Sequence, residues 1–219
     1  MSFYIRDVKR FHDKFGLDTP PIFVFLPEDL YSFRVGFFRE ELKEYVDSCS
    51  GDDLATAVDS LIDLVYIICG AALLHGIDIE PFHAIIEDSE LIDVYDPLET
   101  DEPDKNGPNF LLQHNEEKLI KLLEKNIESY ERAHGAQSEH GIKQALVAMY
   151  LNCLFGASDM GITQECWDDM WSDVQRANMS KTRAEKASDS KRGSKWDVVK
   201  PPGWVPPRTE EILARYVKL

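Results

Sequence analysis

The sequence has few cysteines, and none of them lies in a metal-binding or disulfide-type spacing. Four occur among 219 residues, Cys49, Cys69, Cys153 and Cys166, and no two form a CxxC pair. So few thiols exclude a disulfide-stabilised scaffold and a zinc-ribbon protein. We therefore expect reduced thiols and a cytoplasmic protein, which means the host cytoplasm if the protein is viral.

Several catalytic signatures are also missing. The chain has no Gly-rich phosphate loop, no GxSxG and no HExxH, and its six histidines show no metal-ligand spacing. These absences exclude P-loop nucleotidases, α/β-hydrolases and zincin proteases. The longest apolar run, Leu64 to Leu74, is too short for a membrane span, and residues 1–7 turn polar too early for a signal sequence. We expect no membrane partner.

Positive charge is scarce except near the C-terminal end. The chain has 24 Lys and Arg against 40 Asp and Glu, a formal net charge of -16, which argues against a nucleic acid polymer as partner. Over 176–208 the balance reverses, with nine basic and three acidic residues. The same stretch is rich in Ser, Gly and Pro, so we expect it to be mostly irregular. It is either a lid whose cations hold an anion or a flexible, solvated tail.

The sequence does contain carboxylates on the apolar face of a predicted helix over 27–49. Apolar residues recur there at intervals of three and four, as in an amphipathic helix. At about 100° per residue, Glu41 falls inside the apolar arc, Glu44 lies at its edge and Glu40 lies farther out. Glu41 is therefore expected to point into the protein.

A second predicted helix, over 52–75, carries another acid pair. Nearly every residue after Leu61 is apolar, which is typical of a central helix, so Asp63 is expected to be buried. No Lys or Arg occurs within this helix to neutralise it. Asp59 lies one turn before Asp63, and therefore on the same face.

Each acid cluster has an ordinary explanation when taken alone. An EExxE sequence on a helix is usually a solvated face, and an Asp near a helix start, such as Asp59, often serves the helix dipole. Two clusters on neighbouring helices with inward members instead favour a site for Mg²⁺ or Mn²⁺, which prefer carboxylate oxygens.

The remaining periodic segments are helical too, and no stretch shows convincing strand alternation. Apolar spacing predicts further helices over these ranges: 4–15, 80–92, 115–134, 142–155 and 163–176. Gly76 is expected to end the 52–75 helix in the left-handed conformation. The fold class is therefore all-α.

The acid pattern resembles that of a known superfamily. Glu40-Glu41-x-x-Glu44 followed by Asp59-x-x-x-Asp63-Leu-Val-Tyr66 is similar to the signature of the all-α nucleoside triphosphate pyrophosphohydrolases, the MazG-like superfamily. That superfamily includes dimeric dUTPases and phosphoribosyl-ATP pyrophosphohydrolase. Two later segments, Ala177-Asn178-Met179-Ser180-Lys181 and Lys200-Pro201-Pro202-Gly203-Trp204, resemble the segment that closes the nucleotide site in one branch common in phages and bacteria.

The resemblance implies a MazG-like helical bundle in one domain over 1–219. Its core helices would lie at about 27–80 and 163–208, with a helical insertion at about 81–162 and an irregular, basic C-terminal segment. Family members usually form homodimers or homotetramers that share the site between subunits.

The resemblance also implies metal-dependent hydrolysis between the α and β phosphates, which gives a nucleoside monophosphate and pyrophosphate. One to three Mg²⁺ or Mn²⁺ ions would be held by these acids: Glu41, Glu44, Asp63 and, because Ser60 stands where many relatives have an acid, Asp59. Glu40 and Glu41 would be the catalytic pair, with Glu40 as a ligand or general base. The nucleotide would contact these residues: Asn178, Lys181, Lys191, Arg192, Lys195 and Lys200.

The substrate is left open by the sequence. A deoxynucleoside triphosphate is the first candidate, with a purine such as dGTP favoured, as in phage enzymes that remodel nucleotide pools. Alternatives within the same fold are dUTP, dCTP and phosphoribosyl-ATP. Trp196 and Trp204 are candidates for stacking on a base, although tryptophans are more often core residues. The rival class is a non-enzymatic helical interaction module whose acids bind Ca²⁺ or only confer solubility.

Overall fold

The structure is a computed structural model that describes residues 3–51, 53–77, 110–194 and 196–217. Seven α-helices and a two-stranded antiparallel ribbon are found in those residues. The helices are α1 (Phe3–Phe15), α2 (Glu28–Ser50), α3 (Leu54–His75), α5 (Phe110–Gly135), α6 (Glu139–Asp159), α7 (Gln164–Met179) and α8 (Thr209–Tyr216). The strands are β1 (Thr182–Arg183) and β2 (Val198–Val199), with a 3₁₀ turn at Ala187–Asp189 between them. The all-α prediction is confirmed, and the described residues also contain this ribbon, which the sequence did not predict.

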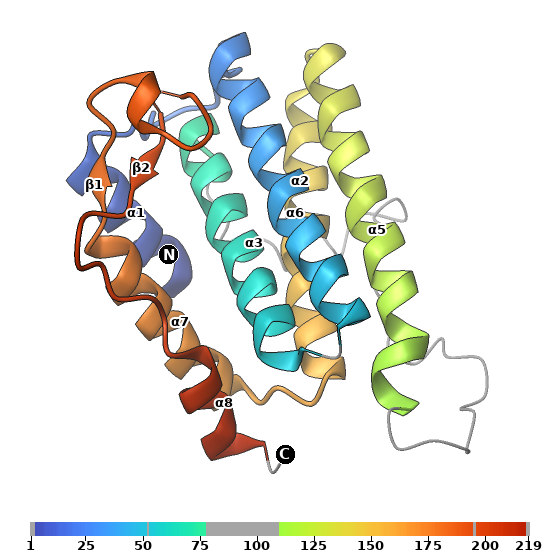
Figure 1. Ribbon diagram of the computed structural model, residues 1–219. Coiled ribbons are helices and arrows are strands. Elements are labelled where there is room, and N and C mark those ends of the chain that lie inside the picture. The colour runs from blue at the N-terminus through green and yellow to red at the C-terminus, as the bar shows by residue number, and fades with distance from the viewer. Residues whose placement is uncertain (1–2, 52, 78–109, 195, 218–219) are drawn as a thin grey trace.

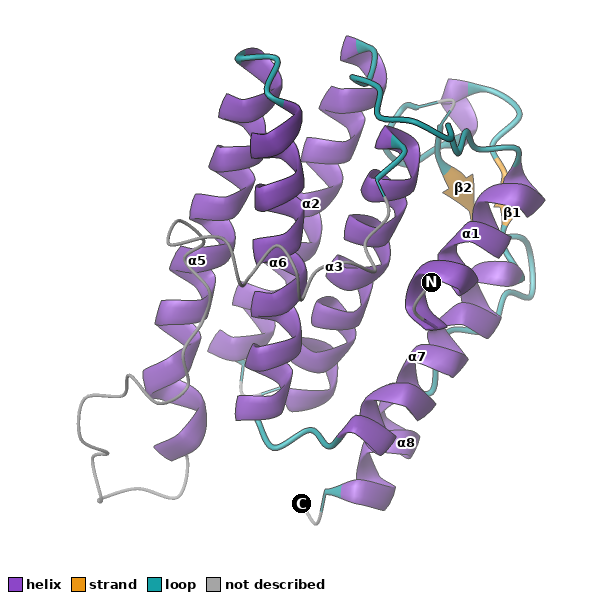
Figure 2. Cartoon of the chain, turned by 180° about the vertical axis from the view of Figure 1, so that it is seen from behind, coloured by secondary structure: helices purple, strands orange, loops and turns teal. Residues whose placement is uncertain are grey.

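Helix α3 lies at the centre of the molecule. It packs against α2 and α6 on one side and against α1, α7 and α8 on the other, while α5 closes the bundle against α2 and α6. The view from behind shows the same division into two groups of helices (Figures 1 and 2). This position explains why α3 is apolar all round, since every face of the helix meets another element.

Both ends of α3 are fixed by specific residues. At the start, the Asp53 side chain accepts hydrogen bonds from the backbone N–H and the hydroxyl of Thr56, at 3.0 and 2.6 Å. At the end, Gly76 adopts φ 69°, ψ 30°, which confirms the predicted left-handed cap. By length and composition α3 is able to cross a membrane, but 89% of that apolar window is buried within the protein, as a central helix requires.

Two of the helices expected between 81 and 162, α5 and α6, belong to the same bundle as α2 and α3. Helices α5 and α6 pack on each other and on α2 and α3 rather than forming a separate body. Both begin earlier and end later than predicted; α6 starts at Glu139 because the Ser138 side chain caps it, accepting from the N–H of Gly141. The helix predicted over 80–92 lies outside the described residues.

The basic C-terminal segment runs back across the molecule from α7 and returns to α8 (Figure 1). The ribbon places Thr182 opposite Val199, and Arg183 donates a hydrogen bond of 2.6 Å to the carbonyl of Phe15 at the end of α1. Farther along, Asp173 of α7 accepts hydrogen bonds of 2.8 Å from both the backbone N–H and the guanidinium of Arg208. The segment is therefore anchored at both ends to helices on the α1 side of the bundle.

Candidate active site

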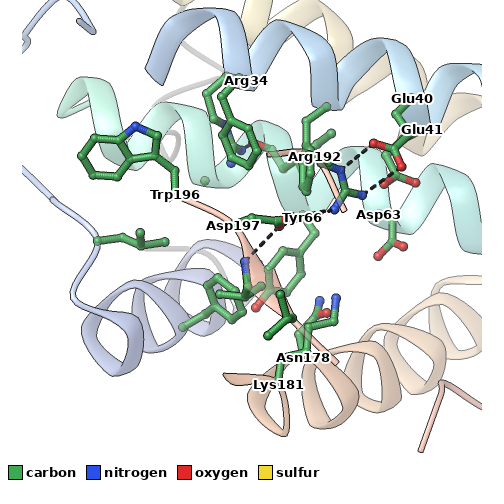
Figure 3. A pocket seen from close by; sticks show the side chains of 18 of the residues that line it. Arg34, Glu40, Glu41, Asp63, Tyr66, Asn178, Lys181, Arg192, Trp196 and Asp197 are labelled. Atoms are coloured by element: carbon green, nitrogen blue, oxygen red, sulfur yellow. Dashed lines mark hydrogen bonds and ion pairs between the residues drawn. The ribbon is translucent and has the colours of Figure 1, made fainter. Parts of the chain in front are cut away.

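One pocket of about 450 Å³ lies between α2, α3, α1 and the C-terminal segment. Its lining includes acids from α2 and α3, bases from residues 181–200, and aromatic side chains, among them Trp196 (Figure 3). The volume is in the range of small-molecule sites in proteins. Segments far apart in the sequence thus border a single cavity.

The acidic wall is formed by four predicted site residues: Glu40, Glu41, Glu44 and Asp63. Glu41 is 7% exposed, and one of its carboxylate oxygens, Oε2, is buried without a hydrogen-bond partner. The inward position predicted for Glu41 is therefore confirmed. The prediction that Asp63 is buried is only partly right, because the residue keeps intermediate exposure where it borders the pocket.

The close acids alter one another's protonation. Burial, followed by the charges of Asp63, Glu44 and Glu40, raises the pKa of Glu41 to about 9. Burial and the neighbouring Asp59 raise the pKa of Asp63 to about 7. Each of these carboxylates therefore disfavours the ionised form of its neighbours.

The opposite wall carries the positive charges. Asn178 is buried at the end of α7, and Lys181, Lys191, Arg192 and Lys200 follow it around the pocket. Burial lowers the pKa of Lys181, and the charge of Asp63 opposes that effect. Lys200 lies over the ring of Trp204, with Nζ 4.4 Å from its centroid. Five of the six residues predicted to contact a nucleotide therefore share one side of the pocket.

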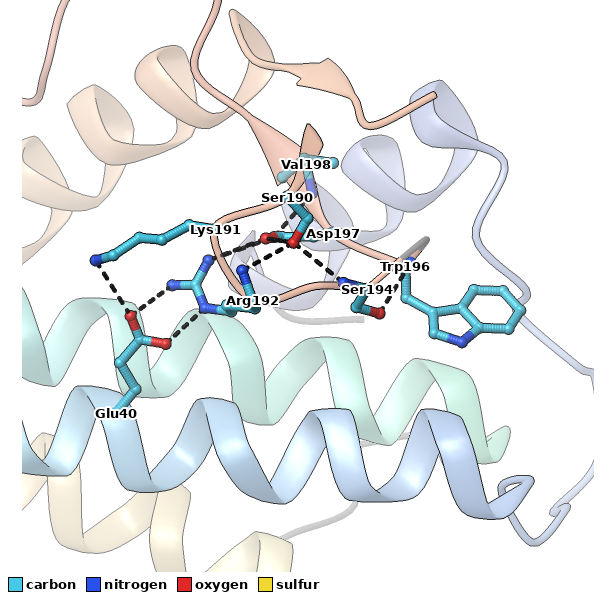
Figure 4. Close-up of polar contacts among 8 residues, drawn as sticks. All are labelled: Glu40, Ser190, Lys191, Arg192, Ser194, Trp196, Asp197 and Val198. Carbon is cyan, nitrogen blue, oxygen red and sulfur yellow. Dashed lines mark hydrogen bonds and ion pairs between the residues drawn. The ribbon is translucent and has the colours of Figure 1, made fainter. Parts of the chain in front are cut away.

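Arg192 joins the two walls. Its guanidinium donates to both oxygens of Glu40, at 2.5 and 3.0 Å, and is also paired with Asp197 at 3.3 Å (Figure 4). Asp197 in turn accepts a 2.7 Å hydrogen bond from Ser190, which holds the loop in shape. Lys191 lies farther out, 3.8 Å from Glu40 and largely exposed. Glu40 is thus matched by a fork-shaped cation from the C-terminal segment.

Two predicted site residues are not placed on these walls. Asp59 borders a different cavity, beside α8, and accepts a 2.8 Å hydrogen bond from Thr209. Its charge still contributes to the raised pKa of Asp63, so the two side chains are near each other. A role for Asp59 as a metal ligand stays a prediction. Lys195 lies outside the described residues.

The acidic wall fits a hard divalent cation in chemistry. Its donors are carboxylate oxygens, and the unpartnered oxygen of Glu41 is the kind of group that a cation would satisfy. Within the part of the chain that the structure describes, no three Asp, Glu, His or Cys side chains are grouped closely enough to hold an ion. Glu40 is turned toward Arg192 in this arrangement, so ion binding would require these carboxylates to converge.

The far end of the pocket was missed by the sequence analysis. It contains Arg34, which is 7% exposed, and His12 of α1, which is 1% exposed. Arg34 precedes Glu41 by seven residues, two helical turns, so the spacing that directs Glu41 inward also directs Arg34 inward. That signal was present in the sequence. The contribution of α1 is a long-range packing result and left no comparable signal.

Residues 8–90 match the sequence profile of one protein family, described as phosphoribosyl-ATP pyrophosphohydrolase. This part of the chain belongs to that family. The matched residues include both acid clusters and end well before the C-terminal segment. No curated protein and no solved structure matches the chain significantly.

The match over residues 8–90 confirms, for this part of the chain, the predicted relation to the all-α, MazG-like pyrophosphohydrolases. It implies an enzyme with pyrophosphohydrolase-type activity on a nucleotide, and the family generally uses Mg²⁺. The resemblance of residues 177–204 to a nucleotide-closing segment lies outside the match and stays a prediction.

Proposed function

We propose that the protein is a metal-dependent pyrophosphohydrolase that cleaves a nucleoside triphosphate between its α and β phosphates. The observation that carries this proposal is the buried Glu41, which has one unpartnered carboxylate oxygen and borders a pocket with acids on one wall and lysines and arginines on the other. Such a pocket suits a polyanion and a divalent cation bound together.

The acids would divide the work by position. Glu41, Glu44 and Asp63 would hold Mg²⁺ or Mn²⁺. Asp59, whose charge raises the pKa of Asp63, would be a further ligand. When bound, the cation supplies neutralisation of phosphate charge and activation of water. Glu40, once freed from Arg192, would accept a proton from the attacking water.

The basic wall would bind the phosphates. Arg192 and Lys181 would pair with the triphosphate oxygens, and Asn178, Lys191 and Lys200 would add further contacts. A contact from Lys195, which lies outside the described residues, stays a prediction. The water oxygen then bonds to the α-phosphorus as the bond to the bridging oxygen breaks. Pyrophosphate leaves with that bridging oxygen, and a nucleoside monophosphate remains.

The favoured substrate is a deoxynucleoside triphosphate, with dGTP first. Phosphoribosyl-ATP is a second candidate, favoured by the family that matches residues 8–90. We further propose a homodimer or homotetramer in the cytoplasm.

The proposal is tested by product analysis on a panel of triphosphates and phosphoribosyl-ATP, with and without Mg²⁺. We expect Mg²⁺-dependent release of pyrophosphate and a monophosphate. Orthophosphate as the only product would contradict cleavage at the α-phosphorus. No product from any nucleotide would favour the rival interaction module.

Two isosteric variants test the acidic wall. We expect Glu41→Gln and Asp63→Asn each to lower kcat/KM by about a hundredfold or more, the order seen when one charged or hydrogen-bonding group is removed from an active site. Asp47→Asn is the matched control on α2, because Asp47 is exposed and pairs with Lys43 at the surface. Full activity in Glu41→Gln would overturn its assigned role.

A further inference from the structure

The end of the pocket away from the acids contains a buried cation with unused hydrogen-bond donors. Arg34 donates to the carbonyl of Ile67, but its Nε is buried without a partner. Among the described residues no carboxylate forms an ion pair with it. Burial lowers the pKa of Arg34 only to about 10, so the guanidinium is charged at neutral pH. A buried charge in this state is costly unless a ligand uses it.

His12 lies beside this cation and offers the opposite hydrogen-bonding character. Its Nδ1 is 3.3 Å from the carbonyl oxygen of Asp18, and a carbonyl only accepts, so Nδ1 carries the proton. Burial, followed by the charge of Arg34, lowers the pKa of His12 to about 4. The ring is therefore neutral at pH 7, and Nε2 is an acceptor.

Gly70 of α3 has no side chain, and this leaves open the space next to Arg34 and His12. A Cβ atom at this position would lie 3.0 Å from an Nη of Arg34 and 3.3 Å from Nε2 of His12. The donor and the acceptor are thus neighbours that face the same small volume. Aromatic rings border it as well, since Phe33 and Phe37 line the pocket with their centroids 5.1 Å apart.

The distance from this end to the acids fits a nucleoside. Asp63 and Gly70 are seven residues apart on α3, about 10 Å at 1.5 Å per residue. Arg34 and Glu41 have the same separation on α2. Figure 3 shows Arg34 and Trp196 toward one end of the pocket and Glu40, Glu41 and Asp63 at the other. Phosphates at the acids would therefore place the base near Arg34.

We propose that Arg34 and His12 select the base of the substrate by reading a lactam edge, an oxo group beside a ring N–H. Guanine, hypoxanthine and uracil present this edge, with the oxo group accepting from Arg34 and the N–H donating to His12. Adenine and cytosine present an amino group beside a bare ring nitrogen, so donor would face donor. This assignment rests on the proposed function, because it places a nucleotide in the pocket.

The test is equilibrium binding of non-hydrolysable α,β-imido triphosphates of deoxyguanosine, deoxyinosine, deoxyuridine and deoxyadenosine. We expect the three lactam-bearing analogues to bind the wild-type protein about tenfold or more tighter than the adenine analogue, the scale of one hydrogen bond to a charged donor. Deoxyinosine lacks the 2-amino group of guanine, so its tight binding would assign the preference to the lactam edge. Equal binding of all four, or tighter binding of the adenine analogue, would overturn the proposal.

Variants then identify the residue. Arg34→Gln should lower affinity for the guanine and hypoxanthine analogues about tenfold while leaving the adenine analogue within about threefold. Arg34→Lys keeps the positive charge, so its affinity for the guanine and hypoxanthine analogues should lie between those of the wild-type protein and Arg34→Gln. Arg39→Gln is the matched control, since Arg39 lies on the same helix but is exposed and pairs with Glu131 at 2.7 Å. A base preference that survives Arg34→Gln would overturn the role of Arg34.

The binding assay also separates this proposal from the proposed function. Selective binding without pyrophosphate release would contradict the enzyme and leave the base assignment standing. Pyrophosphate release without base selectivity would support the enzyme and contradict the base assignment. If Arg34→Gln fails to fold, the analogue series on the wild-type protein and Arg34→Lys still decide the outcome.

Discussion

Glu41 and Arg34 share one face of α2, and both are buried without a partner of opposite charge in contact. Two helical turns separate them, so they do not neutralise each other. Each instead faces one end of the pocket. At the scale of residues, the site is defined by ionisable groups that folding leaves without a counter-charge: Arg34, which is cationic, and Glu41, whose carboxyl keeps its proton at neutral pH. These are the groups that a ligand would satisfy.

The pH dependence of stability follows from Glu41. Its carboxyl has an ordinary pKa of 4.5 and a folded pKa of about 9, so between those values the folded protein holds a proton that the unfolded chain releases. Stability of the metal-free protein should therefore fall as pH rises through this window. Urea unfolding in a chelator at several pH values measures the slope, which should be smaller in Glu41→Gln. A slope that is unchanged in the variant would contradict the burial of a protonated Glu41.

Sequence periodicity predicted the inward direction of Glu41 because helical spacing is a local property. The same spacing predicts an inward Arg34, and this signal would have indicated the end of the pocket that contains Arg34 and His12. Asp59 shows the limit of local reasoning: it faces Thr209 of α8, 150 residues away, and no spacing within α3 indicates that partner.

At the scale of elements, the turn after α3 fixes how the chain enters α2. Gly76 has a positive φ, and a Cβ atom there would collide with the backbone carbonyl of Ile22. Beside it, the carbonyl of His75 accepts a 2.9 Å hydrogen bond from the N–H of Val24. The connection before α2 therefore packs directly against the end of α3.

We expect Gly76→Ala to lower the free energy of unfolding by about 2–3 kcal/mol, because both the φ strain and the backbone collision must be accommodated. Gly161→Ala is the matched control: its φ is also positive, 80°, but nothing lies within 4 Å of the added methyl group. That variant should cost about 1 kcal/mol. Chemical denaturation measures both, and equal losses would contradict the close approach at Gly76.

Elements with strong periodicity were predictable from the sequence, and short or anchored ones were not. Helices α2 and α3 lie within two residues of their expected limits. Helix α8 has eight residues and was not predicted, because its position depends on contacts such as those between Asp173 and Arg208. The ribbon of β1 and β2 has two residues in each strand, too few to show a recognisable alternation of polar and apolar residues.

At the scale of the whole molecule, the pocket combines the first third of the chain with residues 178–200. The family match covers only 8–90, so the basic wall is known from the structure rather than from the match. The Arg192–Glu40 pair spans 152 residues of sequence and connects the two parts. Local charge and composition distinguish the basic segment from the rest of the chain in the sequence. Only the fold shows that this segment borders the acids of α2 and α3.

The most direct test of the account is hydrolysis of dGTP with Mg²⁺ in water labelled with heavy oxygen, followed by mass analysis of the products. Attack on the α-phosphorus by water at the acidic wall predicts the label in dGMP and unlabelled pyrophosphate, with turnover lost in Glu41→Gln and kept in Asp47→Asn. Label in pyrophosphate or orthophosphate, or turnover that persists in Glu41→Gln, would contradict it.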